Sequence, residues 1–107
     1  MTGHRKQYVE PITIDGILDW LERTVSALVD FPGCVRVQAM KGAQTTIFEV
    51  KVDPGDVRRL IGRKGRTAGA LREILTNFGA RIKMRCHLEI LEPSHSIEEI
   101  PTLGAEE

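Results

Sequence analysis

The chain has 107 residues, of which 41% are hydrophobic and 28% are charged, and its formal net charge at pH 7 is zero. This length predicts one domain with a modest hydrophobic core. The apolar stretches are only a few residues long and nothing resembles a signal peptide, so we expect a cytoplasmic protein with no membrane contact. Cys34 and Cys86 have no C-x-x-C spacing, which favours reduced thiols over a disulfide.

The zero net charge hides a strong asymmetry along the chain. Residues 1–50 carry five Lys/Arg and six Asp/Glu. Residues 51–85 carry ten Lys/Arg against three Asp/Glu, a local net charge of +7. Residues 86–107 carry six acids and no Lys/Arg, a net of −6. Binding of a polyanion depends on the local patch, so the overall neutrality does not exclude a nucleic-acid partner.

The first half of the chain predicts one helix and a hairpin. Segment 15–30 has apolar residues at helical spacing, with Asp15 as the predicted N-cap. Trp20 lies in this apolar stripe, which favours packing over base stacking. Segments 34–40 and 45–52 alternate apolar and polar residues, and a short turn with a glycine joins them. This pattern predicts two antiparallel strands.

Two further helices are predicted before the last strand. The first begins after Asp53, its predicted N-cap, has Pro54 at its first position and stops at Gly62. The second covers 66–78, and Gly79 stands where a left-handed C-cap is expected. Both helices fall within the basic part of the chain.

Residues 80–91 alternate strictly and predict the last strand. Its polar face begins with Arg81, Lys83 and Arg85, and this basic ladder fits a binding surface and a solvated strand face equally well. The predicted fold is α+β, in the order α-β-β-α-α-β. It has a three-stranded mixed sheet, with the last two strands parallel, and three helices on one face.

The connection between the last two helices, Gly62, Arg63, Lys64 and Gly65, is the candidate functional site and is called the glycine loop below. Glycine lets a ligand approach the main chain, and a helix beginning at the second glycine directs free N–H groups towards an anion. The glycines alone fit a tight helix–helix turn equally well. The charges of Arg63, Lys64 and Arg66 favour a nucleic-acid strand as the ligand.

A nucleotide-binding enzyme is one alternative. A P-loop requires a glycine five residues before Gly65 and Lys-Ser or Lys-Thr after it, but Leu60 and Arg66 stand at the flanking positions. No paired carboxylates, nucleophile or histidines with metal-ligand spacing accompany the loop. We therefore predict no enzyme activity and no catalytic residue, metal site, cofactor or small-molecule substrate.

The segment 50–72 contains the kernel Ile61, Gly62, x, x, Gly65 between predicted helices, and it resembles the core of a KH domain. The helix and strand that precede it resemble the type II KH topology. The length, the single copy and the phrase IGRKGRTA are similar to those of the small bacterial single-KH proteins of the KhpA group. This resemblance implies an RNA-binding protein that acts as an RNA chaperone or post-transcriptional regulator, with roles in cell shape and cell wall biogenesis.

The resemblance covers roughly residues 12–91, the predicted KH domain. Residues 1–11 are expected to form a flexible arm, and residues 92–107 a flexible acidic tail. Gly69 departs from the family pattern, because small KH proteins often carry a basic residue at this helical position.

In KH domains about four nucleotides of single-stranded RNA lie in a groove, and the glycine loop clamps their backbone. Carried over, the glycines allow close approach and the loop cations contact phosphates. Ile61 and Leu71 would form the groove floor, and Ile82 with its neighbours would line the opposite wall. The implied RNA-binding residues are Ile61, Gly62, Arg63, Lys64, Gly65, Arg66, Leu71, Arg81, Ile82 and Lys83.

A protein-interaction module is the second alternative. The KhpA resemblance implies pairing with a second KH-containing protein, and a homodimer is compatible with the sequence. Either form of association is compatible with RNA binding.

Overall fold

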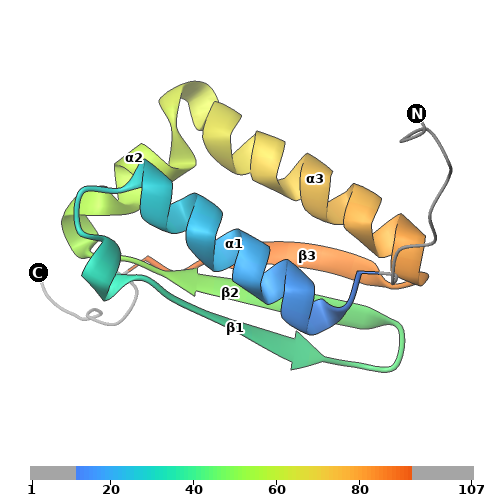
Figure 1. Cartoon of the computed structure of the whole chain (residues 1–107). Coiled ribbons are helices and arrows are strands. Elements are labelled where there is room, and N and C mark those ends of the chain that lie inside the picture. The colour runs from blue at the N-terminus through green and yellow to red at the C-terminus, as the bar shows by residue number, and fades with distance from the viewer. Residues whose placement is uncertain (1–11, 93–107) are drawn as a thin grey trace, which may run out of the picture.

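The computed structural model describes residues 12–92, so the predictions for the arm (1–11) and for the tail beyond residue 92 lie outside the described residues. Three helices cover one face of a three-stranded sheet (Figure 1). The predicted α+β class and the α-β-β-α-α-β order are confirmed. The elements are α1 (Ile14–Leu28), β1 (Arg36–Lys41), β2 (Thr45–Lys51), α2 (Val57–Ile61), α3 (Arg66–Ile82) and β3 (Arg85–Ile90).

The N-cap of helix α1 lies two residues before the predicted one. The Thr13 side chain accepts a hydrogen bond from the Gly16 N–H at 3.0 Å, so Thr13 is the N-cap and the assignment to Asp15 was wrong. Asp15 instead lies in the first turn, where its negative charge favours the helix dipole. The apolar stripe is confirmed by three buried side chains, Ile17, Leu21 and Val25.

The sheet has the order β1-β2-β3, with β1 and β2 antiparallel and β2 and β3 parallel, as predicted. Phe48 of central β2 pairs with Ala39 on one side and Leu88 on the other. Alternation along β2 buries Thr46, Phe48 and Val50 against the helices. Strand β1 starts at Arg36 and not at residue 34, because Pro32–Cys34 form a 3₁₀ turn.

The boundary between α3 and β3 was predicted wrongly. Helix α3 continues to Ile82 and ends at Lys83, which has left-handed backbone angles (φ 59°, ψ 47°). Gly79 lies inside the helix and is not its cap. A Cβ at Gly79 would collide with the carbonyl oxygen of Met84. Glycine at this position therefore lets the segment before β3 pack directly against the helix. Residues 80–82 are therefore helical, and the strand begins only at Arg85.

Helices α1 and α3 pack side by side over the core. The rings of Trp20 and Phe78 meet edge to face with centroids 5.2 Å apart, which confirms packing as the role of Trp20. Leu60 of α2 and Leu75 of α3 are fully buried with Phe48. This common core fixes the end of α2 relative to the start of α3, and so positions the connection between them.

Candidate nucleic-acid interface

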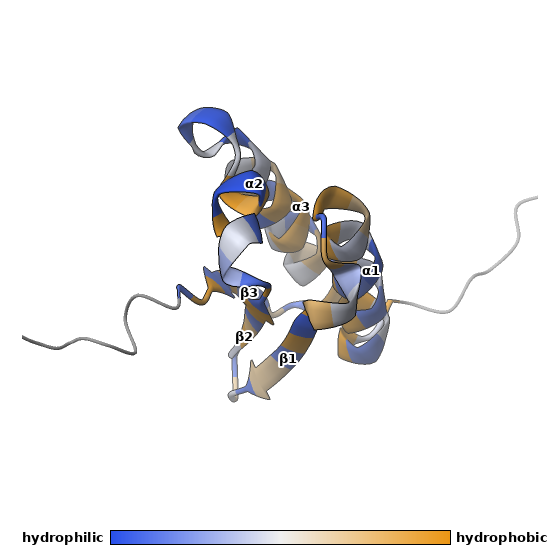
Figure 2. Cartoon of the chain, turned by 90° about the vertical axis from the view of Figure 1, so that its left-hand side faces the viewer, coloured by the Kyte–Doolittle hydropathy of each residue, from blue (hydrophilic) through white to orange (hydrophobic). Residues whose placement is uncertain are grey.

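The glycine loop has a defined backbone geometry between the two helices. Helix α2 ends at Ile61, and Gly62 follows with φ 84° and ψ 169°. The Gly62 N–H donates to the Arg58 carbonyl at 2.9 Å, and the Gly65 N–H donates to the Gly62 carbonyl at 3.0 Å. Lys64 (φ 55°) and Gly65 (φ 73°) are also in the positive-φ region. Figure 2 shows this hydrophilic connection projecting away from the sheet.

The two glycines of the loop have different roles. A Cβ at Gly62 would collide with the side chain and backbone nitrogen of Thr67, so this position must be glycine for the turn to close. A Cβ at Gly65 would meet no atom within 4 Å. Gly65 therefore leaves open space directly above the main chain, where a ligand backbone can approach.

The cations of the loop have no acidic partner in the part of the chain that the structure describes. Arg63, Lys64 and Arg66 are exposed, and no ion pair involves them within residues 12–92. By contrast, Arg59 contacts the Asp30 carboxylate at 3.3 Å. The positive charge at the loop is thus not neutralised by any acid among the described residues and is available to an anion.

Helix α3 adds a partial positive charge to the same place. Its 17 residues begin directly after Gly65, and no side chain caps this N-terminus. The Arg66 N–H donates to the Arg63 carbonyl, whereas the next N–H groups of the first turn have no acceptor within the helix and lie beside the loop cations. An open depression lined by Arg58, Ile61, Gly62 and Arg63 adjoins the loop. Together these groups can hold a phosphate and a neighbouring apolar group.

The structure places the predicted groove-floor residues Ile61 and Leu71 in different surroundings. Ile61 is half-buried and lines the depression, as a groove floor requires. Leu71 is only 4% exposed and belongs to the hydrophobic core, so the structure does not place it on an open floor.

Arg81, Ile82 and Lys83 do not lie on a strand beside the loop. They form the last turn and cap of α3, whose 17 residues span about 25 Å at the usual helical rise. Ile82 packs against the core. The predicted opposite wall of the groove is therefore not built by these residues, because the helix continues past Gly79.

A buried carboxylate just before α2, which sequence analysis missed, fixes the start of the helix that leads into the glycine loop. Asp56, 1% exposed, lies just before α2 and accepts hydrogen bonds from the backbone N–H groups of Asp30 and Phe31, both at 3.0 Å. Its Oδ1 is also 3.9 Å from the Arg59 guanidinium. The sequence gives only a local signal, an acid in a first helical turn, since its partners lie 25 and 26 residues away.

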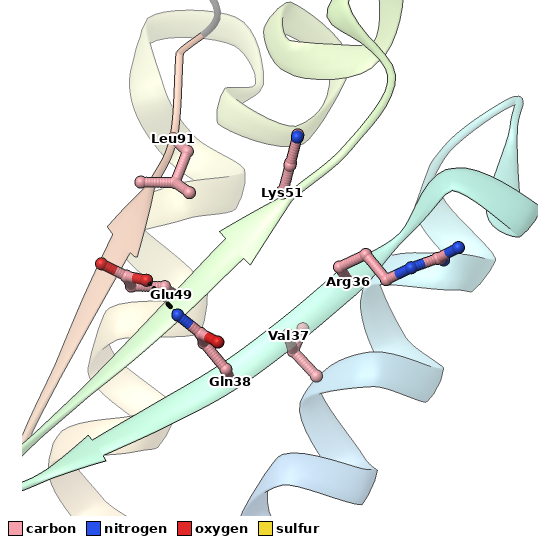
Figure 3. Close-up of a pocket in the computed structure, with 6 residues that line it drawn as sticks. All are labelled: Arg36, Val37, Gln38, Glu49, Lys51 and Leu91. Carbon is pink, nitrogen blue, oxygen red and sulfur yellow. Dashed lines mark hydrogen bonds between the residues drawn. The ribbon is translucent and has the colours of Figure 1, made fainter.

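A second depression lies across the sheet and contains none of the glycine loop (Figure 3). The Gln38 amide donates to the Glu49 carboxylate at 2.7 Å within it. Its charges are mixed, so it lacks the single sign expected of a phosphate site. It is lined by Arg36, Val37, Gln38, Glu49, Lys51 and Leu91.

Two cysteines lie within residues 12–92, and they differ in exposure. Cys34 is exposed and Cys86 is buried, and both are free thiols. Burial raises the pKa of Cys86 above its ordinary value. No three side chains of the metal-binding types gather in this part of the chain. Its helices also include none with the length and apolarity of a membrane span.

Comparison with known proteins places this architecture in a family. Residues 19–90, which include all of the glycine loop and all of the sheet, match the family described as "KhpA/KhpB, KH domain". No solved structure matches the chain at a significant level.

Several relatives carry the name "RNA-binding protein KhpA". The protein from Aquifex aeolicus is 43% identical over 79 residues, covering 74% of this chain and all of the relative. Those from Borreliella burgdorferi and Chlamydia pneumoniae are 37% and 36% identical, covering 70% and 69% of this chain and 92% and 95% of their own lengths. The glycine loop and its fold therefore belong to a known group: this chain is a member of the KhpA/KhpB family of KH-domain proteins.

Proposed function

We propose that this protein binds single-stranded RNA and that the glycine loop holds the sugar–phosphate backbone. The observation that carries the proposal is the open main chain at Gly65, flanked by Arg63, Lys64 and Arg66, which form no ion pair within residues 12–92. Relatives at up to 43% identity are named RNA-binding proteins, which supports RNA as the polyanion.

In this mechanism the backbone is held first and the bases are positioned second. The Arg63 guanidinium and the Lys64 ammonium neutralise phosphates, while the N–H groups that follow Arg66 in the first α3 turn donate to phosphate oxygens. A base next to the clamped phosphate can lie over Ile61 in the adjoining depression. Only five aromatic residues are present in the whole chain, so recognition depends on shape and backbone contact more than on stacking.

We infer that this binding serves RNA chaperoning or post-transcriptional regulation in the cytoplasm, without catalysis. A clamp on the backbone holds a strand single-stranded while reading few bases, which suits either role. The family resemblance extends the proposal to cell shape and cell wall biogenesis. The chaperone role predicts that the protein accelerates annealing of two complementary RNA strands, and unchanged annealing would contradict it.

Protein interaction, as a homodimer or with a second KH-containing protein, is the alternative function. The supporting observation is that no helix of residues 12–92 covers the second face of the sheet (Figure 1), and that Met40 (45% exposed) and Leu91 (37% exposed) present apolar surface next to it. Sedimentation equilibrium of the whole chain tests self-association. A monomer at all concentrations would contradict the homodimer.

The double variant Arg63→Asp/Lys64→Asp tests the RNA proposal. We expect lost binding to labelled single-stranded RNA in fluorescence anisotropy, with an unchanged circular-dichroism spectrum. Arg23→Asp/Lys41→Asp is the matched control, because it changes net charge equally on α1 and at the far end of β1. Retained affinity in the loop variant, or equal loss in both variants, would show that the glycine loop is not the clamp.

A further inference from the structure

A second group of cations lies at the opposite end of α3 from the glycine loop. Arg81 lies in the last helical turn, Lys83 is the cap and Arg85 begins β3. All three are exposed, and none forms an ion pair within residues 12–92. We call these three residues the distal cluster. Lys83 and Arg85 border a depression that Gln44 closes from the β1–β2 turn.

Backbone hydrogen bonds hold this depression in shape. The Gly79 carbonyl accepts from the N–H groups of both Lys83 and Met84, the latter at 2.9 Å. The Arg85 N–H donates to the Gln44 carbonyl at 2.9 Å, which joins the turn to the hairpin. The cations therefore project from a fixed turn and not from a loose loop.

Lys83 has a backbone conformation that its side chain disfavours. A helix that ends in the left-handed region usually has glycine at this position, because a Cβ is strained there. Within residues 12–92 only two non-glycine residues have positive φ, and both are lysines: Lys64 in the glycine loop and Lys83 in the distal cluster. Each end of α3 thus keeps a cation where glycine would be less strained.

One exposed side of α3 runs from the glycine loop to the distal cluster. Gly69, Arg72, Thr76 and Ala80 follow one another at steps of three or four residues, so they share one side of the helix, and all four are exposed. Phe78, which contacts α1, lies on the other side. A Cβ at Gly69 would meet no atom within 4 Å, so the surface is open there. Glu73, four residues after Gly69, is exposed on the same side, so the path itself carries one acid beside Arg72 and the excess positive charge lies at its two ends.

We propose that the distal cluster is a second phosphate-binding site for the same RNA strand. The strand leaves the glycine loop, follows the exposed side of α3 past Arg72, and reaches Lys83 and Arg85 about 25 Å away by the helical rise. This inference rests on the proposed RNA binding. It adds that the protein contacts more RNA than the roughly four nucleotides of a KH groove.

RNA length distinguishes this site from the clamp. Binding is measured for oligouridines of about four and about twelve nucleotides, within the range of single-strand site sizes. In the variant Lys83→Gly/Arg85→Gln, the longer RNA is expected to bind severalfold more weakly. Its salt dependence should fall by about 1.4 log units per decade of salt, the value for two lost single-strand phosphate contacts. The shorter RNA should bind as before.

The substitution to glycine also separates binding from folding. Lys83→Gly relieves the left-handed strain, so the melting temperature should not fall while affinity for the longer RNA does. The control Arg23→Gln/Arg36→Gln removes the same charge elsewhere and should leave both RNAs unaffected. No loss with the longer RNA, or equal loss with both lengths, would overturn the distal site. Failure of the glycine-loop proposal would give a different result: Arg63→Asp/Lys64→Asp would then leave the affinity for both RNA lengths unchanged.

Discussion

The buried carboxylate of Asp56 accepts a hydrogen bond from the backbone N–H of Phe31, 25 residues earlier in the chain, at 3.0 Å. This contact and its neighbour at Asp30 fasten the segment after α1 to the start of α2. Since α2 has only five residues before the glycine loop, a fixed start also fixes the direction in which the loop leaves.

Loss of the Asp56 carboxylate is expected to destabilise the fold. Asp56→Ala leaves two backbone N–H groups without their charged acceptor and should lower the free energy of unfolding by about 3 kcal/mol. Asp56→Asn retains an amide oxygen as acceptor and should cost less. Urea unfolding followed by circular dichroism measures both variants, and equal stability of Asp56→Ala and the unchanged protein would contradict the role.

The two loop glycines should respond differently to alanine. Gly62→Ala brings a Cβ against Thr67 in addition to its positive φ, so it should mainly reduce stability. Gly65→Ala meets no neighbour and should cost only the left-handed strain, about 1 kcal/mol. Its methyl group instead covers the proposed approach path of RNA. Melting temperature and RNA affinity, measured on both variants, should therefore rank them in opposite order.

Alanine substitutions at the two glycines inside α3 should change the free energy of unfolding in opposite directions. Gly69→Ala has open space for its methyl group and gains helix propensity, so it should stabilise the protein by about 1 kcal/mol. Gly79→Ala would press against the Met84 backbone and should cost about 1–3 kcal/mol. Thermal unfolding of the two variants checks the sign. A stable Gly79→Ala would mean that the helix can move away from the turn before β3.

The cysteines should differ in reactivity. Exposed Cys34 is expected to react with a thiol reagent in the native protein, while buried Cys86 should react only after unfolding. Because the pKa of Cys86 is raised in the fold, the neutral thiol is favoured there. The contribution of the neutral Cys86 thiol to the free energy of unfolding is present below the ordinary thiol pKa. It is lost as the pH rises through the higher pKa that Cys86 has in the folded protein. Counting reacted thiols with and without denaturant tests the difference, with Cys34→Ser as control.

The elements set by local periodicity were predictable from the sequence. The stripe of α1 and the alternation of β2 placed Leu21 and Phe48 in the core. The glycine loop was predictable too, because its glycines and cations are adjacent in the chain. These signals lie within a few residues, where sequence patterns carry most information.

The errors arose where distant contacts decide the structure. Ile82 fits an alternating strand, but it also lies four residues after Phe78, so both periods are satisfied and packing on the core selects the helix. A glycine after an apolar helical stripe usually indicates a C-cap, so Gly79 was predicted as one. Its actual role, the close contact with the Met84 backbone, leaves no pattern in the sequence. The partners of Asp56 are likewise remote. The glycine loop therefore lies between two helices as predicted, whereas Arg81, Ile82 and Lys83 lie at the end of α3 and not on a strand.

Strand β1 leaves one edge of the sheet unpaired, since the strand order is β1-β2-β3. An antiparallel meeting of two such edges, centred on the strand, would set Arg36 of one copy against Lys41 of the other. This repulsion would occur at both ends of the paired strands, and like charges placed opposite each other disfavour pairing. The charges that begin and end β1 therefore disfavour this centred edge-to-edge pairing of two copies.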